Sequence, residues 1–185
     1  MIHGEKTILR ALESADTELL HLWMNDPEVT RWLGRRLPMN LGEVRQWVEE
    51  PIDRSRDLRL GITDLAGQLI GWCDLSRWDP LQDSAVLTIA IGDKASWGGG
   101  YGTDATLTLC GYGFAQLNLH RLGLFVFASH APAVHVYEKI GFRHEGRMVE
   151  SSFRHGARQD LLVMGLLREE FRAKWPERWA SFLVS

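Results

Sequence analysis

The stretch "SWGGGYGTDA", residues 96–105, places four glycines within five positions and leads directly into a segment with helical character. Glycine is costly to order and contributes no side-chain packing, so the cluster indicates a backbone that turns unusually or is approached closely. It lies between a strand-like run, "SAVLTIAIG" (residues 84–92), and the predicted helix "YGTDATLTLCGYGFAQLN" (residues 101–118). The free N–H groups and the positive dipole end of a helix that starts here predict an anion site.

Three interpretations of the glycines compete. "GYGTDA" satisfies GxGxxA, the pattern of dinucleotide-binding folds, but that pattern should follow the first strand of a parallel unit and precede a strand that ends in an acid. Here three strand-like segments in apparent hairpins come first, and the next strand ends "FVFAS". The context favours a pyrophosphate cradle for another cofactor, while a purely structural glycine turn remains the third interpretation.

The rest of the chain alternates between two periodicities. Helical spacing of apolar residues predicts helices over residues 14–26, 40–50 and 132–141, and β-like runs cover residues 7–12, 58–64, 68–78, 121–129, 142–154 and 157–167. No repeat or linker interrupts this order. We therefore predict one mixed α/β domain over residues 1–185.

Composition excludes several classes of function. A net charge of −3 on 185 residues argues against binding nucleic acid or a membrane surface. The absence of an apolar run approaching about 20 residues predicts a cytoplasmic protein. Cys73 and Cys110 each lie in an apolar segment, which predicts buried free thiols, and no Cys/His cluster indicates a metal site.

The order of "WGGGYGT", a helix, the strand "LNLHRLGLFVFA" and "AVHVYEKIGFRHEG" resembles the GNAT superfamily of acetyl-CoA-dependent N-acetyltransferases. The resemblance is closest to the branch that acetylates N-terminal amines of ribosomal proteins. It implies an α/β (α+β) fold with a mixed, mostly antiparallel central sheet flanked by helices. It also implies acetyl-CoA as co-substrate and no metal.

In this family the loop Q/R-x-x-G-x-G/A binds the coenzyme A pyrophosphate, and Trp97, Gly100 and Gly102 take those places. Trp97 replaces the usual Gln or Arg, so backbone N–H groups must supply more of the binding, with the Thr103 hydroxyl as a further donor. The splayed strand before the loop, "TIAIG" (residues 88–92), is expected to give backbone donors to the pantetheine and the thioester carbonyl. The full set of coenzyme contacts implied by the resemblance is Ile89, Ala90, Ile91, Trp97, Gly98, Gly99, Gly100, Tyr101, Gly102, Thr103, His130 and Ala133.

The family's general acid is the tyrosine of "YEKIGF", here Tyr137. A phenol with a pKa near 10 suits protonation of a thiolate, whose thiol has a pKa near 8.5. His130 stands where relatives usually have Asn, so it could replace that side chain as a donor or simply occupy the helix cap.

The general base is harder to assign. Many relatives read "AELG" on the strand before the loop, whereas this chain has "AVLT", which puts Val86 at the position of the Glu. Alternation predicts an apolar face made of Ala85, Leu87, Ile89 and Ile91. Matching it to the apolar face of the preceding strand in a hairpin places Asp74 beside Thr88. Asp74 is therefore the candidate base or amine-binding carboxylate, with a water chain as the alternative.

The acceptor is left open among a peptide N-terminus, a small amine and a polyamine. We assign Trp32, Trp72 and Thr88 to its binding. Two other functions remain: a non-catalytic acyl-CoA-binding module, because Val86 lacks the carboxylate, and transfer of a larger acyl group such as succinyl, for which Arg77 is the candidate cation. By analogy with the family, the last hairpin and the C-terminal tail could form a homodimer.

Overall fold

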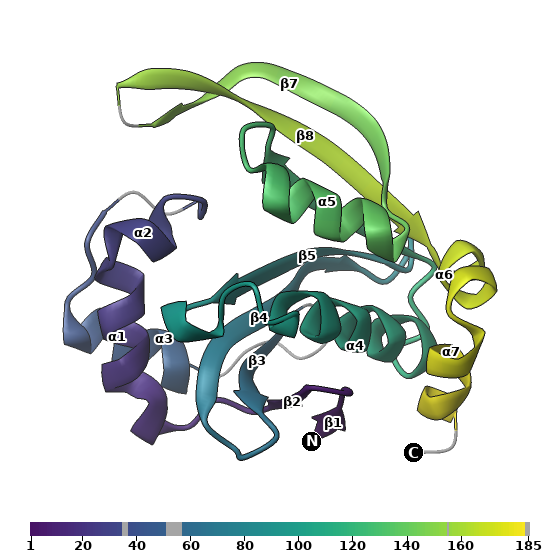
Figure 1. Cartoon of the computed structure of the whole chain (residues 1–185), viewed down its shortest axis with the longest axis horizontal. Helices are drawn as coiled ribbons and strands as arrows, with labels where there is room; N and C mark the ends of the chain where they lie inside the picture. The colour runs from purple at the N-terminus through teal and green to yellow at the C-terminus, as the bar shows by residue number, and fades with distance from the viewer. Residues whose placement is uncertain (35–36, 51–56, 155, 184–185) are drawn as a thin grey trace. The chain divides into compact units, whose positions relative to one another are not determined.

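The computed structural model describes residues 1–34, 37–50, 57–154 and 156–183 (Figure 1). The strands are β1 (Ile2–His3), β2 (Thr7–Arg10), β3 (Leu58–Asp64), β4 (Leu69–Asp79), β5 (Ser84–Ile91), β6 (Arg121–Phe127), β7 (Arg143–Arg154) and β8 (Ala157–Leu167). The α-helices are α1 (Thr17–Asn25), α2 (Pro27–Thr30), α3 (Leu41–Glu49), α4 (Tyr101–Ala115), α5 (Ala131–Ile140), α6 (Arg168–Lys174) and α7 (Pro176–Leu183), and two short 3₁₀ turns cover Ser14–Asp16 and Lys94–Ser96.

Internal contacts group the chain into two compact units. The first contains Met1–Ser76 and Thr88–Leu109, and the second contains Arg77–Leu87 and Cys110–Ser185. Both β5 and α4 contribute residues to each unit. The prediction of a single domain over residues 1–185 stays a prediction.

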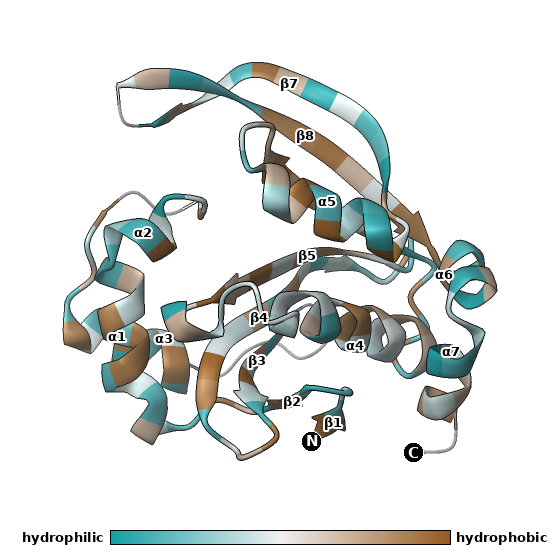
Figure 2. Ribbon diagram, in the orientation of Figure 1, coloured by the Kyte–Doolittle hydropathy of each residue, from teal (hydrophilic) through white to brown (hydrophobic). Residues whose placement is uncertain are grey.

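In the first unit, the sheet runs in the order β1-β2-β3-β4 and continues into the Thr88–Ile91 part of β5. The β1–β2, β2–β3 and β3–β4 pairs are antiparallel, and the last of them sets Arg59 opposite Asp74. The three helices α1, α2 and α3 contribute apolar side chains to a core shared with β4 and β5 (Figure 2). Leu20 and Val44 are fully buried there, as helical spacing predicts, whereas Leu22, an apolar residue at helical spacing on α1, is 65% exposed.

In the second unit, the start of β5 pairs in parallel with β6, from Ser84 opposite Arg121 to Val86 opposite Gly123. The order continues through β8 to β7, and both of those pairs are antiparallel. The prediction of a mixed, mostly antiparallel sheet flanked by helices is confirmed. Among the described residues, no helix is long and apolar enough to cross a membrane.

The two cysteines behave as their apolar settings predict. Cys73 on β4 and Cys110 on α4 are both free thiols with no exposed surface. Burial raises the pKa of each thiol well above its usual range, so both are inert packing groups rather than nucleophiles.

Candidate functional site

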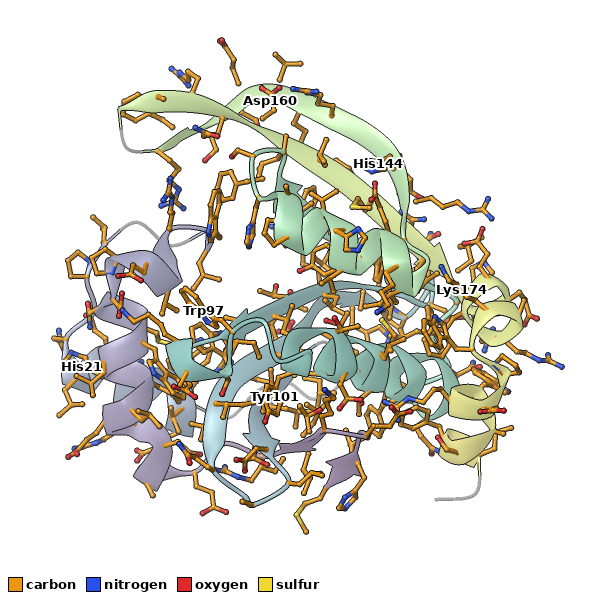
Figure 3. All side chains as sticks on the ribbon, in the orientation of Figure 1. His21, Trp97, Tyr101, His144, Asp160 and Lys174 are labelled. Carbon is orange, nitrogen blue, oxygen red and sulfur yellow. The ribbon has the colours of Figure 1, made fainter. Side chains whose placement is uncertain are left out.

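The glycine loop connects the 3₁₀ turn Lys94–Ser96 to α4. Gly98 and Gly100 have φ values of +75° and +84°, a left-handed conformation that other residues adopt only with strain. The whole segment from Trp97 to Gly100 is exposed, and Figure 3 labels Trp97 and Tyr101 at this end of α4. Turn geometry therefore explains two of the four glycines, and it holds the loop open in front of the helix.

The first turn of α4 provides unpaired backbone donors. Its first main-chain hydrogen bond runs from the Asp104 N–H to the Gly100 carbonyl at 3.0 Å. The N–H groups of Tyr101, Gly102 and Thr103 precede it, and helix geometry gives such groups no partner inside the helix. A Cβ atom added at Gly98 would meet nothing within 4 Å, so there is room beside the loop. These donors and this space fit a coenzyme pyrophosphate.

Trp97 serves the loop differently from the Gln or Arg it replaces. Its indole Nε1 donates to the Ile91 carbonyl at 2.9 Å, although 45% of the side chain is exposed. Because Trp has a single donor, this bond leaves none for a phosphate. The arrangement agrees with the expectation that backbone N–H groups supply the anion binding.

The strand before the loop departs from simple alternation. Ala85 and Leu87 are buried as predicted, but beyond them Ala90 is 8% exposed whereas Ile89 and Ile91 are only half-buried. The alternation of buried and half-buried residues changes here because Ala90 packs into the core of the first unit. The neighbouring strand approaches closely at this point, since a Cβ atom at Gly71 of β4 would lie 2.2 Å from the Ala90 carbonyl oxygen. The predicted apolar face over all four positions is therefore wrong at its last two.

Part of the backbone predicted to donate to the pantetheine is already bonded. The Gly92 N–H donates to the Ile70 carbonyl at 2.9 Å, which excludes it as a donor to the coenzyme. Ile89, Ala90 and Ile91 keep their predicted role as coenzyme contacts.

Asp74 lies where alternation placed it. Its half-buried carboxylate accepts hydrogen bonds from the hydroxyls of Thr88 and Ser76, so the prediction that Asp74 lies beside Thr88 is confirmed. Burial raises the pKa of Asp74 to about 6, against the opposing effect of these two hydrogen bonds and of the Arg59 charge. A carboxylate that titrates near neutrality is a better proton acceptor than an ordinary Asp, whose pKa is about 3.9.

Arg59 is a feature that sequence reasoning missed. It is the cross-strand partner of Asp74, its guanidinium lies 4.1 Å from the centre of the Trp47 ring, and it donates to the Trp47 carbonyl. The signal was available, because pairing β3 with β4 in the predicted hairpin sets a cation opposite Asp74.

The two tryptophans assigned to the acceptor differ. Trp72 is 5% exposed and packs edge-to-face against Trp47 with ring centres 6.4 Å apart, and its contact with the acceptor stays a prediction. Trp32 is half-buried, with the Arg31 guanidinium 5.0 Å from its ring centre, and its acceptor role stays a prediction. Residues 35–36, which end the segment "WMNDPEVTRWLGRR" (residues 23–36) expected to contribute to the acceptor pocket, lie outside the described residues.

In the second unit, Tyr137 projects from α5 into an apolar setting. It is 9% exposed and packs edge-on against Phe142 with ring centres 5.8 Å apart. Burial, followed by the neighbouring Cys110, raises the pKa of Tyr137 to about 12. The phenol therefore keeps its proton at neutral pH, which is the state a general acid needs.

His130 and Ala133 lie at the start of α5. The His130 carbonyl accepts the Ala133 N–H at 3.0 Å, and His130 is the N-cap residue of α5, although its side chain makes no capping hydrogen bond. The interpretation that this histidine occupies the helix cap is therefore confirmed, and its role as a donor to the coenzyme stays a prediction. Burial lowers its pKa, and the imidazole is accordingly neutral at physiological pH. A neutral imidazole retains one donor and one acceptor, as an Asn side chain does.

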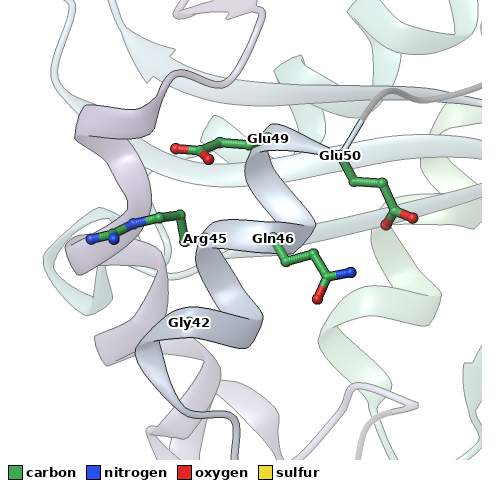
Figure 4. A pocket seen from close by; sticks show the side chains of 5 residues that line it. All are labelled: Gly42, Arg45, Gln46, Glu49 and Glu50. Carbon is green, nitrogen blue, oxygen red and sulfur yellow. The ribbon is translucent and has the colours of Figure 1, made fainter.

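A surface hollow on α3 is lined by none of the predicted site residues. Figure 4 shows its lining, which comes from α3 and the residue that follows it: Gly42, Arg45, Gln46, Glu49 and Glu50. Within the described ranges, no three His, Cys, Asp or Glu side chains are grouped to hold a metal ion.

Comparison with known proteins identifies the chemistry. Residues 6–143 match the family described as "Acetyltransferase (GNAT) domain". Spermidine N(1)-acetyltransferase from Vibrio cholerae is 29% identical over 163 residues, which cover 88% of this chain and 94% of that protein. A putative ribosomal N-acetyltransferase of Bacillus subtilis, YdaF, is 29% identical over 179 residues, covering 92% and 96%.

Solved structures agree with these matches. The crystal structure of spermidine N-acetyltransferase from Vibrio cholerae in complex with CoA and spermine superposes with a TM-score of 0.85 at 28% identity. The superposition covers 91% of this chain and 99% of that one. The chain is therefore an N-acetyltransferase whose acetyl donor is acetyl-CoA.

Proposed function

We propose a polyamine as the acetyl acceptor of this chain, which belongs to the GNAT acetyltransferase family. The observation that carries the proposal is the likeness, over nearly the whole of both chains, to a spermidine acetyltransferase that was solved with CoA and spermine. Curated spermidine acetyltransferases from two bacterial species support it, because their similarity also extends over about nine-tenths of this chain.

The chemistry requires an amine that has lost its proton. Acetyl-CoA supplies the activated acetyl group when bound. An alkylammonium has a pKa near 10, so at neutral pH it must give up a proton before its nitrogen can form the new C–N bond. We assign the Asp74 carboxylate to accept that proton, directly or through one water. Its raised pKa of about 6 reduces the difference between the pKa of the ammonium and the pKa of the accepting carboxyl group.

Cleavage of the C–S bond leaves a thiolate that needs a proton. We assign Tyr137 to supply it, since the buried phenol holds its proton throughout the physiological range. The attacking nitrogen loses its second proton to solvent as the amide forms, solvent restores the proton of Tyr137, and Asp74 returns its proton to solvent. The backbone N–H groups at the start of α4 bind the pyrophosphate and hold the coenzyme in place.

An acceptor panel tests the proposal. The purified full-length chain is mixed with acetyl-CoA and, separately, spermidine, spermine, a short peptide with a free N-terminus, and spermidine acetylated at both primary amines, while thiol release is followed. We expect turnover with spermidine and spermine and none with the doubly acetylated control. Turnover with the peptide and none with either polyamine would overturn the proposal.

A protein N-terminus is the second candidate acceptor. The similarity to the putative ribosomal N-acetyltransferase favours it, because that match is as high in identity and as complete in coverage as the match to the Vibrio cholerae spermidine N(1)-acetyltransferase. The two acceptors differ in charge: a polyamine carries several cationic nitrogens, whereas a peptide N-terminus carries one. Spermidine should therefore inhibit peptide acetylation competitively if both enter the same site.

A further inference from the structure

The turn between β1 and β2 is fastened to the start of α4 by one carboxylate. Asp104 accepts hydrogen bonds from the backbone N–H groups of Glu5 (3.0 Å), Lys6 (2.9 Å) and Thr7 (2.9 Å), and from the Thr7 hydroxyl (2.7 Å). Asp104 is 6% exposed, and the bonded residues lie 97–99 positions away in the chain. Because the carboxylate accepts hydrogen bonds from three successive backbone N–H groups, it fixes the conformation of this turn beside the glycine loop.

The turn is also packed too closely for a side chain at Gly4. A Cβ atom there would lie 2.3 Å from the Asp104 carboxylate and 2.6 Å from the Thr108 hydroxyl. Sequence reasoning missed this arrangement, although Asp104 is the only acidic residue in the predicted helix over residues 101–118.

The fixed turn places a cation at the loop. The Lys6 Nζ donates to the Gly99 carbonyl at 3.0 Å, and it lies 3.4 Å from the position that a Cβ atom at Gly100 would take. Lys6 is exposed, and its ammonium has three donors, of which the Gly99 carbonyl uses one.

Charge explains why a cation is useful here. Asp104 lies in the first turn of α4, where a carboxylate stabilises the helix but opposes the binding of a second anion to the same helix start. The Lys6 ammonium balances that charge on the side of the loop, and its free donors suit phosphate oxygens.

We propose that Lys6 binds the pyrophosphate of the coenzyme and that Asp104 holds the turn from which it reaches. The inference rests on the assignment of the glycine loop to that pyrophosphate. It adds a residue from the N-terminal strand pair, outside the loop motif, to the set of coenzyme ligands. Binding of acetyl-CoA and of free CoA should depend on it equally, because both carry the same phosphates.

Calorimetric titration of the full chain with CoA tests the proposal. Lys6→Gln should weaken CoA binding about 10- to 100-fold, the range of a lost charge-assisted hydrogen bond, and Lys6→Arg should bind within a few-fold of the original chain. Lys174→Gln is the matched control, because Lys174 also donates to a backbone carbonyl, that of Glu138 on α5. It should bind CoA as the original chain does. Thermal melting confirms that each variant is folded.

A comparison of CoA with dephospho-CoA shows which phosphate Lys6 contacts. Dephospho-CoA lacks the 3′-phosphate but keeps the pyrophosphate, so Lys6→Gln should weaken its binding by the same factor. If Lys6→Gln weakens the binding of CoA but not that of dephospho-CoA, the proposal is overturned, because the lysine then contacts the 3′-phosphate. Unchanged CoA affinity in Lys6→Gln would also overturn it. Failure of the original chain to bind CoA at all would instead overturn the assignment of the glycine loop.

Discussion

Replacing the Asp74 carboxylate should change the pH dependence of the enzyme as well as its rate. Asp74→Asn keeps the size of the side chain and its capacity to accept from Thr88 and Ser76, but it cannot take a proton. With a pKa of about 6, the carboxylate is ionised to about 9% at pH 5, about 50% at pH 6 and about 91% at pH 7. The base-dependent rate should therefore fall about tenfold between pH 7 and pH 5.

The quantity to measure is the ratio of kcat/KM for the original chain to that for Asp74→Asn, taken from thiol release between pH 5 and pH 9. Ionisation of the acceptor amine affects both proteins alike and cancels in the ratio. We expect the ratio to rise to a plateau above pH 7, where the deficit of the variant is about 10- to 1,000-fold. A ratio that stays constant across this pH range would refute a proton-accepting role for Asp74.

Stability gives an independent check with a definite sign. The folded-state pKa of about 6 lies above the unfolded value of about 3.9, so the native state binds more protons between these limits. Stability due to this group is thus present below pH 4 and is lost as pH rises to 6. The difference of about two pKa units between the folded and unfolded states limits this contribution to the free energy of unfolding to about 3 kcal/mol. The remaining contact of Asp74 with solvent lowers it further. Asp74→Asn should therefore gain melting temperature relative to the original chain between pH 4.5 and pH 7.5; a constant difference would contradict the raised pKa.

Three further substitutions test separate parts of the molecule. Tyr137→Phe should lower kcat about 100-fold or more while leaving CoA affinity nearly unchanged, as measured by thiol release and calorimetry. Gly100→Glu should abolish CoA binding in calorimetry, because it adds a carboxylate to the loop and forces a side chain onto a φ of +84°. Gly111→Ala should destabilise the protein by about 1 to 3 kcal/mol in urea unfolding, because its Cβ would lie 2.1 Å from the Phe182 ring.

Each of these has an outcome that would count against it. Full turnover in Tyr137→Phe would make the tyrosine a packing residue, with water protonating the thiolate. A folded Gly100→Glu protein with unchanged CoA affinity would remove the loop from the coenzyme site. For Gly111, the double variant Gly111→Ala/Phe182→Leu should recover part of the lost stability. If it recovers none, the loss does not come from a clash with the Phe182 ring.

Elements with strong local signals could be predicted from the sequence. The alternation along β4 and β5 set Asp74 beside Thr88, and the glycine stretch located the start of α4 correctly. The start of α4 depends only on residues nearby in the chain, and the placement of Asp74 depends only on the adjacent strand of a hairpin. The mixed sheet followed from the order of motifs, because the family fixes its topology.

Properties that depend on packing could not be predicted. Leu22 and Leu20 fit the same helical stripe, and only the tertiary contacts leave the first exposed and the second buried. Trp72 occupies a strand face that is polar by pattern, yet the core contributed by α1 and α3 encloses it. The contact between Lys6 and the glycine loop spans 93 residues and depends on a carboxylate that accepts from three backbone N–H groups as well as from one hydroxyl, which no side-chain pattern records.

The position of Asp74 also bears on what Val86 means. By the family resemblance, the strand before the loop usually carries a Glu where this chain has Val86, which by itself would indicate a site that binds coenzyme without catalysis. Val86 and Thr88 are both half-buried and two positions apart on β5, and Asp74 of β4 accepts a hydrogen bond from Thr88. A carboxylate on the adjacent strand thus reaches the same strand face as the missing Glu. Because burial also moves the pKa of Asp74 toward neutrality, the substitution at Val86 relocates the candidate base to β4, and the absence of Glu from β5 is no evidence of lost activity.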